Sequence, residues 1–278
     1  MDPPALVRGR AVTSAASGRP TSFTDVAEFY DELMRGVPYR SWLRYIEQSL
    51  QRRLMIPGAV LDLACGTGAM AELMARKRWP VIGVDLSAEM IAHARAKART
   101  ARLPIEYLVQ DAARLDLGGR TVDLCVCVFD SLNYITDPVA LQQAFQRVLA
   151  HLSPGGLFLF DLNSEYALRN GFFDQDNIST ADRLQYRWRS EYDPETRHCT
   201  VNMRFQYVDG DGTVRPFIET HTQRAYGHEE VLAMLERTGY VGIEAYHAYT
   251  FRPVRATSDR ISYVACAPPS PDGEGEQE

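Results

Sequence analysis

Residues 60–68 read VLDLACGTG, an apolar run that contains one acid, Asp62, and ends in the turn Gly66-Thr67-Gly68. The apolar part has the length of a buried β-strand, and a helical pattern follows it. The two glycines allow a tight turn and let a ligand approach the backbone, because glycine has no Cβ. The free N–H groups at the start of the next helix attract a carboxylate or a phosphate. The stretch therefore predicts a strand, a ligand-binding loop and a helix.

Strands and helices alternate from this stretch onward. Apolar runs of strand length occupy 59–65, 81–86, 105–111, 122–130 and 157–162, with helical patterns between them. Asp137 is placed to cap the helix that Pro138 begins, and Ser153-Pro154-Gly155-Gly156 is expected to end it. Such alternation predicts right-handed βαβ units around a parallel sheet with helices on both faces. We therefore expect a doubly wound α/β core.

The rest of the chain has other patterns. Over 184–192, 199–207 and 214–226 apolar and polar side chains alternate, which predicts an antiparallel meander. The expected segments are a disordered leader (1–20), an N-terminal helical lid (21–57), the Rossmann-like core (58–165), an antiparallel β insertion that covers the substrate site or forms a dimer face (166–226), a helix and strands that complete the core (227–268) and an acidic disordered tail (269–278).

Composition narrows the class of protein. Of 278 residues, 45% are hydrophobic and 24% are charged, which is typical of a globular protein. The net charge of −6 makes a nucleic acid an unlikely partner, since nucleic-acid binding favours a basic surface. No apolar run is long enough to cross a membrane, and no secretory signal is seen. The five cysteines are odd in number and lack CxxC spacing, which favours reduced thiols in the cytoplasm and no metal site.

Acids stand at the ends of three successive expected strands. Because ligands bind beyond the carboxyl ends of such strands, these acids are expected to converge. Asp85 follows Gly68 by 17 residues, a position suited to ribose hydroxyls, and Asp111 with the N–H of Ala112 suits the edge of adenine. Three acids suit a nucleoside and repel a diphosphate, so the loose GxGxxG dinucleotide pattern is the weaker interpretation. Asp62 suits an ammonium group. S-adenosylmethionine carries all of these groups.

At this point the chain resembles a known family, the class I S-adenosylmethionine-dependent methyltransferases. The matching motifs are VLDLACGTG (60–68), VIGVDLSAEMIAHAR (81–95), YLVQDAARLDL (107–117), VDLCVCVFDSLNYI (122–135) and LSPGGLFLFDLNS (152–164). The resemblance implies a seven-stranded sheet whose last strand is antiparallel, with S-adenosylmethionine as cofactor. Its implied cofactor-binding residues are Asp62, Ala64, Gly66 and Gly68 for the methionine end, Asp85 for the ribose, Leu86, Met90, Asp111 and Ala112 for the adenine, and Phe129 and Tyr30 around them.

A narrower resemblance concerns the methyl acceptor. The stretches FYDELM (29–34), VPYRSWLRY (37–45), FDSLNY (129–134) and ETHTQRAY (219–226) are similar to a bacterial group related to small-molecule and amino-sugar N-methyltransferases. The resemblance implies a small-molecule substrate, and a homodimer is possible.

Candidate residues for the acceptor lie in FDSLNY, after the fifth strand and in the meander. Tyr134 and His221 are the catalytic candidates, and the substrate candidates are Asn133, Tyr134, Asn163 and Arg224. Glu219 and His221 share one face of a strand and can act as a base and its orienting partner, or only tie the meander to the sheet. An amine acceptor can lose its proton to water, so a protein base is not required.

The sequence thus predicts a methyltransferase that acts on nitrogen or oxygen of a small metabolite. Two alternatives stay open. One is a tRNA or protein methyltransferase, and the other is a non-catalytic regulatory protein that binds S-adenosylmethionine.

Overall fold

The computed structural model describes residues 26–178 and 182–270. Its main sheet has seven strands in the order β10 (Val241–His247), β11 (Arg260–Cys266), β5 (Leu152–Asn163), β4 (Val122–Cys127), β1 (Val60–Leu63), β2 (Val81–Asp85) and β3 (Ile105–Val109). Neighbouring strands from β5 to β3 are parallel, whereas β11 runs antiparallel to both β5 and β10. The expected doubly wound sheet with a reversed last strand is therefore confirmed.

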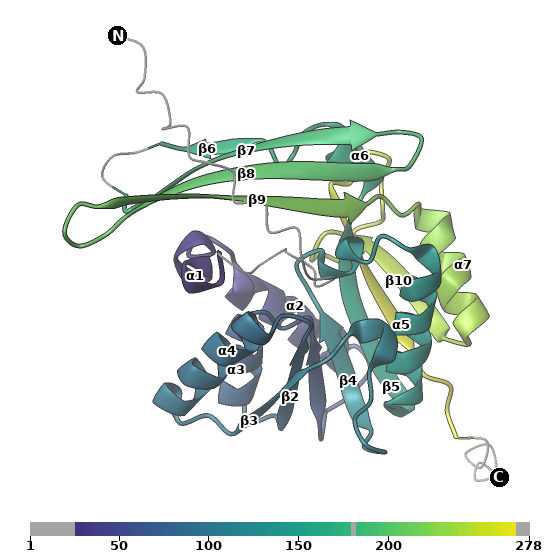
Figure 1. The fold of residues 1–278 in the computed structure, drawn as a ribbon. Coiled ribbons are helices and arrows are strands. Elements are labelled where there is room, and N and C mark those ends of the chain that lie inside the picture. The colour runs from purple at the N-terminus through teal and green to yellow at the C-terminus, as the bar shows by residue number, and fades with distance from the viewer. Residues whose placement is uncertain (1–25, 179–181, 271–278) are drawn as a thin grey trace, which may run out of the picture.

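Helices cover both faces of this sheet (Figure 1). On one face lie α5 (Pro138–Ala150) and α7 (His228–Thr238), which bury Phe145, Val148 and Leu235 against the strands. On the other face lie α2 (Tyr39–Gln51), α3 (Ala69–Arg76) and α4 (Ala88–Ala101). The central strand β1 is buried along its whole length, because both of its faces are covered. The loop that contains Gly66, Thr67 and Gly68 begins at its carboxyl end.

A second sheet lies across one end of the core (Figure 1). It consists of β6 (Gln175–Asn177), β7 (Leu184–Asp193), β8 (His198–Val208) and β9 (Val214–Arg224), all antiparallel, and is called the cover sheet below. The short helix α6 (Glu165–Arg169) joins it to β5. Its inner face buries the apolar side chains of Trp188, Val201 and Phe205. The predicted meander is thus present.

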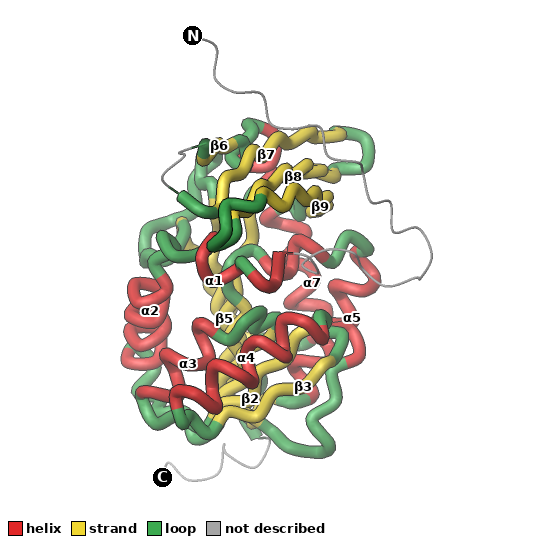
Figure 2. Tube along the Cα trace, turned by 60° about the vertical axis from the view of Figure 1, so that its left-hand side comes forward, coloured by secondary structure: helices red, strands yellow, loops and turns green. Residues whose placement is uncertain are grey.

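The N-terminal lid lies between the cover sheet and the core, as Figures 1 and 2 show for α1 (Tyr30–Leu33). The 3₁₀ turn η1 (Val26–Glu28) precedes α1, and Val26, Ala27 and Phe29 pack on the inner face of the cover sheet together with Met90 of α4. The Phe29 ring lies 4.1 Å from that of Tyr207. The lid therefore joins the cover sheet to α4 of the core.

Some boundaries differ from the sequence-based expectation. The helical pattern over 23–34 is interrupted near Phe29, where the 3₁₀ turn gives way to α1, because the aromatic ring turns toward the cover sheet. Strand β5 begins at Leu152, which pairs with Val122, so the segment expected to end α5 belongs to the strand. Strand β6 is not predicted, because its sequence has no alternation of apolar and polar residues. In the structure its backbone pairs with that of β7.

The expected leader, the first residues of the lid segment and residues 271–278 of the acidic tail lie outside the described residues. Across residues 26–178 and 182–270, every helix is too short or too polar to traverse a lipid bilayer.

Candidate active site

The loop after β1 turns with three left-handed residues. Ala64, Gly66 and Gly68 have φ values of +56°, +54° and +83°. A Cβ on Gly68 would overlap the Tyr107 hydroxyl, so this glycine serves the packing of the loop on β3. A Cβ on Gly66 would meet only the Tyr30 ring, at 3.9 Å. The first glycine therefore faces open space under the lid, where a ligand can approach the backbone.

Asp62 is the acid inside β1, and its side chain is 1% exposed. The carboxyl group of Asp62 accepts a hydrogen bond from the backbone N–H of Ala71. Its Oδ2 atom, however, has no hydrogen-bond partner. Burial raises the Asp62 pKa to about 8, and the charge of Asp85 adds to this effect. A buried oxygen without a partner is costly unless a ligand completes it. A cation such as an ammonium group fits this site.

Asp85 ends β2 and organises the same loop. Its Oδ2 accepts a hydrogen bond from Gly66 N at 2.7 Å, and its Oδ1 accepts one from Ser87 N at 2.9 Å. Burial raises the Asp85 pKa, and these backbone donors oppose the rise. Ser87 caps α4 by accepting a hydrogen bond from Met90 N. Asp85 thus sits beside the glycine loop, where ribose hydroxyls are expected.

A pocket opens at the carboxyl ends of β1 and β4. Its walls come from the glycine loop, the start of α3, the turn after β4 and the lid. The lining residues are Tyr30, Tyr39, Asp62, Ala64, Cys65, Gly66, Thr67, Ala69, Met70, Val128, Phe129 and Ser131. Five of these lining residues are predicted cofactor residues: Tyr30, Asp62, Ala64, Gly66 and Phe129. The structure therefore brings residues expected to contact the methionine end of the cofactor into one pocket.

This pocket is not lined by the residues expected around adenine, which are Leu86, Met90, Asp111 and Ala112. Leu86 is 52% exposed, and Met90 is buried against the lid residues. Asp111 follows β3 and caps the 3₁₀ turn η2 (Ala112–Arg114) by accepting a hydrogen bond from Ala113 N at 2.9 Å. Ala112 is partly buried at the start of that turn. The role that the structure gives to Asp111 is that of the N-cap of this turn.

Comparisons with known proteins agree with this geometry. Residues 60–156 match the model of a methyltransferase domain family. The putative methyltransferase YqeM of Bacillus subtilis is 33% identical over 239 residues, which cover 86% of this chain and 94% of that protein. A crystal structure of an S-adenosylmethionine-dependent methyltransferase from Clostridium acetobutylicum has a TM-score of 0.77, with 31% identity over 88% of this chain and 98% of that one.

The chain belongs to the class I S-adenosylmethionine-dependent methyltransferases. The cofactor of this methyltransferase is S-adenosylmethionine, and the unpartnered oxygen of Asp62 agrees with the ammonium group that this cofactor carries. A further relative is the dTDP-3-amino-3,4,6-trideoxy-α-D-glucopyranose N,N-dimethyltransferase of Streptomyces venezuelae. It is 32% identical over 220 residues, which cover 77% of this chain and 90% of that enzyme.

The catalytic candidates of the methyltransferase meet beneath the cover sheet. The Tyr134 hydroxyl lies 3.2 Å from Nδ1 of His221, and Nε2 of His221 lies 2.6 Å from Oε2 of Glu219. Glu219 Oε1 accepts a hydrogen bond from Val26 N of the lid at 2.8 Å. Tyr134 belongs to the 3₁₀ turn η3 (Ser131–Tyr134) after β4, and the other two residues belong to β9.

This chain of side chains is close to the cofactor pocket. Burial raises the pKa of Tyr30, which lines the pocket, and the neighbouring Tyr39, Tyr134, Asp130 and Asp85 add to the rise. Tyr134 belongs to η3, whose first residue, Ser131, lines the pocket, so the chain of side chains begins at the pocket wall.

The substrate candidates Asn133 and Asn163 are engaged with each other. The Asn133 amide accepts a hydrogen bond from Asn163 N at 2.9 Å and donates to the carbonyl oxygens of Asn163 and Arg224. The Asn163 amide donates to Gln223 at 3.1 Å. The two asparagines therefore tie η3, β5 and β9 together.

Arg224 is not brought to this site. Along β9, Glu219, His221 and Gln223 point to the inner face and are buried, whereas Arg224 is of the opposite parity. Its guanidinium bonds Thr196 O at 3.3 Å and lies 3.8 Å from a carboxylate oxygen of Glu230 at the start of α7.

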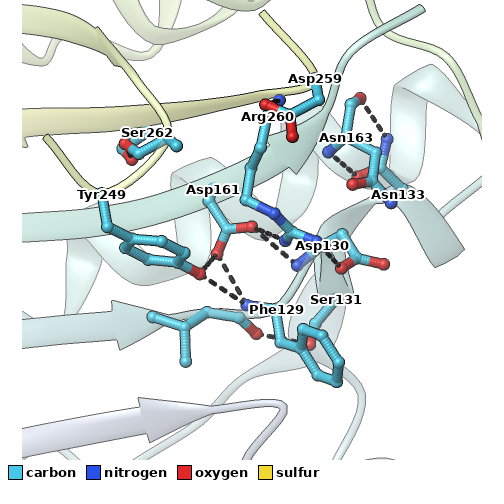
Figure 3. Close-up of polar contacts among 12 residues, drawn as sticks. Phe129, Asp130, Ser131, Asn133, Asp161, Asn163, Tyr249, Asp259, Arg260 and Ser262 are labelled. Atoms are coloured by element: carbon cyan, nitrogen blue, oxygen red, sulfur yellow. Dashed lines mark hydrogen bonds and ion pairs between the residues drawn. The ribbon is translucent and has the colours of Figure 1, made fainter. Parts of the chain in front are cut away.

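A buried ionic cluster beside the pocket was missed from the sequence. Arg260 of β11 pairs with both Asp130 and Asp161, and the Tyr249 hydroxyl donates to Asp161 at 2.6 Å (Figure 3). The acids stand at expected strand ends, but Arg260 lies 99 and 130 residues from them in sequence. Only a lone acid inside an apolar strand, Asp161, signalled that a partner was needed.

The cysteines are all free thiols, as expected. In the described part of the chain, no group of three or more His, Cys, Asp or Glu side chains is arranged to hold a metal ion.

Proposed function

We propose that this methyltransferase transfers the methyl group of S-adenosylmethionine to a nitrogen or oxygen atom of a small metabolite. The observation that carries this proposal is the Tyr134–His221–Glu219 chain, which lies beneath the cover sheet and beside the cofactor pocket. His221 is 1% exposed. An acceptor that reaches these groups must enter under the lid and the cover sheet, which favours a metabolite over the surface of an RNA or a protein.

The cofactor is held, in this proposal, by the residues at the strand ends. Asp62 pairs with the ammonium group, the loop from Ala64 to Gly68 contacts the methionine end, Asp85 accepts hydrogen bonds from the ribose, Leu86, Met90, Asp111 and Ala112 surround the adenine, and Tyr30 and Phe129 close the pocket. When bound, S-adenosylmethionine supplies a methyl group attached to a cationic sulfur, and this sulfur becomes a neutral thioether once the methyl group is transferred. The protein supplies alignment and excludes water.

The Tyr134–His221–Glu219 chain beneath the cover sheet can remove a proton from the acceptor. Both carboxylate oxygens of Glu219 accept hydrogen bonds, one from Val26 N and one from His221. Nε2 of His221 therefore carries the proton that it shares with Glu219, and Nδ1 accepts from the Tyr134 hydroxyl. As the acceptor atom bonds to the methyl carbon, its proton passes to Tyr134 and the Tyr134 proton passes to His221. Glu219 stabilises the imidazolium that forms.

We further infer that the enzyme is cytoplasmic, since its five cysteines are free. We also propose that it forms a homodimer. Sedimentation of the purified chain distinguishes a dimer from a monomer.

The first experiment measures binding of S-adenosylhomocysteine by calorimetry, for the natural chain and for Asp85→Ala. We expect the variant to bind at least about tenfold more weakly, because a charged acceptor is lost and the Gly66 amide is left without its partner. Ser87→Ala is the matched control; it removes the cap of α4 and leaves the Asp85 carboxylate in place. Unchanged affinity of Asp85→Ala would show that the pocket assignment is wrong.

The second experiment supplies S-adenosylmethionine with a labelled methyl group and tests three kinds of acceptor. These are a panel of small amines and hydroxyl compounds that includes dTDP-amino sugars, bulk tRNA, and a protein extract. We expect label in the small-molecule fraction. Label in tRNA or protein would support the macromolecular alternative, and binding without any labelled product would support the regulatory one.

A further inference from the structure

The turn after β4 has an unusual backbone. Phe129 and Asp130 are consecutive non-glycine residues with left-handed φ values of +68° and +50°. L-residues rarely adopt this conformation, and it persists only where the surroundings impose it. Here one carboxylate imposes it: Asp161 Oδ1 accepts from Phe129 N at 2.7 Å, and Asp161 Oδ2 accepts from Asp130 N at 2.9 Å. Asp161 therefore determines the shape of the turn.

Two residues from the far end of the chain hold Asp161 in place (Figure 3). Tyr249, just after β10, donates its hydroxyl hydrogen to Oδ1 at 2.6 Å, and the same hydroxyl oxygen lies 3.2 Å from Phe129 N. Arg260 pairs with Oδ2, and its other terminal nitrogen lies 2.7 Å from Oδ1 of Asp130. All three charged side chains are largely buried, so each contact acts in a medium of low dielectric constant.

The turn that this cluster shapes is a wall of the cofactor pocket, because Phe129 and Ser131 line it. The Phe129 ring lies between the lid and the cluster, 5.3 Å from Trp42 and 5.7 Å from the Arg260 guanidinium. Trp42 also stacks on Tyr249, with ring centroids 4.6 Å apart. A change in the cluster is therefore transmitted to the pocket wall through one ring and one backbone turn.

The same cluster extends to the acceptor side. Asp130 Oδ2 accepts a hydrogen bond at 2.6 Å from the amide of Gln223, which lies two residues beyond His221 on β9. Gln223 in turn accepts from Asn163 at 3.1 Å. The cluster thus joins the core, the lid and the cover sheet at the point where both substrates are expected to meet.

We propose that Tyr249 and Arg260 are positioning residues for the cofactor: they fix the Asp161 carboxylate, which holds the Phe129–Asp130 turn in the shape that closes the pocket. Neither residue is among the pocket-lining side chains, so both act through the Asp161 carboxylate and the Phe129–Asp130 turn that they contact. The inference rests on the proposed function in one respect, the assignment of this pocket to S-adenosylmethionine.

The test compares two chemically identical changes. Tyr249→Phe removes the hydroxyl that orients Asp161 and keeps the ring that stacks on Trp42. Tyr246→Phe, three residues earlier, removes a hydroxyl that donates to Glu244 at 3.0 Å instead of to Asp161. The readouts are the dissociation constant for S-adenosylhomocysteine by calorimetry and the midpoint of thermal unfolding without it.

We expect Tyr249→Phe to bind S-adenosylhomocysteine about tenfold more weakly, the effect of losing one hydrogen bond to a charged group. Tyr246→Phe should bind within about twofold of the natural chain, and the unfolding midpoints should show that both variants are folded at the temperature of the binding measurement. Equal affinity of Tyr249→Phe and the natural chain would overturn the inference and leave the pocket assignment intact. A natural chain that binds no S-adenosylhomocysteine would instead overturn the assignment itself.

Arg260 provides a second test that does not depend on Tyr249. Arg260→Gln removes the charge between the two acids, whereas Arg260→Lys keeps it and reaches one acid at a time. We expect the loss of S-adenosylhomocysteine affinity to be larger for Arg260→Gln and partly restored in Arg260→Lys when both are folded. An equal loss in the two variants, or no loss in either, would contradict a role through the carboxylates.

Discussion

Nε2 of His221 lies 2.6 Å from Oε2 of Glu219, two residues earlier on the inner face of β9. Residues two apart on a strand share a face, so the pairing follows from local geometry. The other ring nitrogen of His221 faces the Tyr134 hydroxyl at 3.2 Å. A histidine held between an acid and a hydroxyl in this way has a defined tautomer, and this is the basis of the first two predictions.

The first prediction concerns His221→Gln. We expect kcat to fall by about 10²- to 10⁴-fold, the usual contribution of general acid–base catalysis, because the proton of the acceptor has no strong base to receive it. The affinity for S-adenosylhomocysteine should stay within about twofold. Thr222→Ala, on the opposite face of β9, is the matched control in steady-state assays. An unchanged kcat would show that the acceptor loses its proton to water.

The second prediction concerns Glu219→Gln, which is nearly the same size. The amide oxygen can still accept from Val26 N, but the amide nitrogen donates to Nε2 of His221 and moves the ring proton to Nδ1. His221 then cannot accept a proton from Tyr134, so kcat should fall by about 10²-fold or more. Initial rates and the unfolding midpoint, measured together, separate this effect from a loss of folding. A kcat equal to that of the natural chain would exclude the proton path.

The third prediction concerns proton release by Asp62, whose pKa burial raises to about 8 from an ordinary value of 3.8. The unliganded protein therefore holds this proton at pH 7, and pairing with an ammonium group lowers the pKa and releases it. S-adenosylhomocysteine affinity should rise between about pH 6 and pH 8. Calorimetry at pH 7 in two buffers of different ionisation enthalpy measures the release. Asp62→Asn should abolish it, and equal release from that variant would assign the proton to another group.

The same shift has a consequence for stability, the fourth prediction. Between the unfolded and folded pKa values, from about pH 4 to about pH 8, the folded state binds one proton at Asp62 that the unfolded chain does not. The contribution of Asp62 to the free energy of unfolding is therefore greatest below pH 4 and is lost as the pH rises through 8. Urea unfolding of the unliganded chain and of Asp62→Asn, at several pH values, measures the difference. A difference that is independent of pH would contradict the raised pKa.

The fifth prediction separates the two glycines of the loop. Gly68→Ala should lower the free energy of unfolding by about 2 to 4 kcal/mol for two reasons. The new methyl group overlaps the Tyr107 hydroxyl, and alanine is strained in the left-handed conformation. Gly66→Ala should cost only about 1 to 2 kcal/mol, since open space surrounds it. Tyr107→Phe should recover part of the Gly68→Ala loss. Urea unfolding of the three variants and the double variant measures this, and no recovery would contradict the overlap.

Local patterns predicted much of the fold and of the cofactor site. Asp62, Asp85 and Asp111 were identified because each lies at or near the carboxyl end of a strand, and these ends converge in a parallel sheet. The pairing of Glu219 with His221 was identified because a two-residue spacing is a property of one strand. Strand β6 was missed, since Gln175, Asp176 and Asn177 have no apolar face. They pair with β7 through their backbone and through an ion pair between Asp176 and Arg189, which lie 13 residues apart.

Contacts between distant segments could not be predicted in this way. The sequence by itself determined the order of strands and helices, the glycine loop and the acids around it, because periodicity and turn chemistry act over a few residues. Only the tertiary structure decided that Tyr134 faces His221, that Arg224 points away, and that Arg260 pairs with Asp161 across 99 residues. These contacts depend on the packing of the cover sheet, the lid and the core, for which a local pattern has no signal.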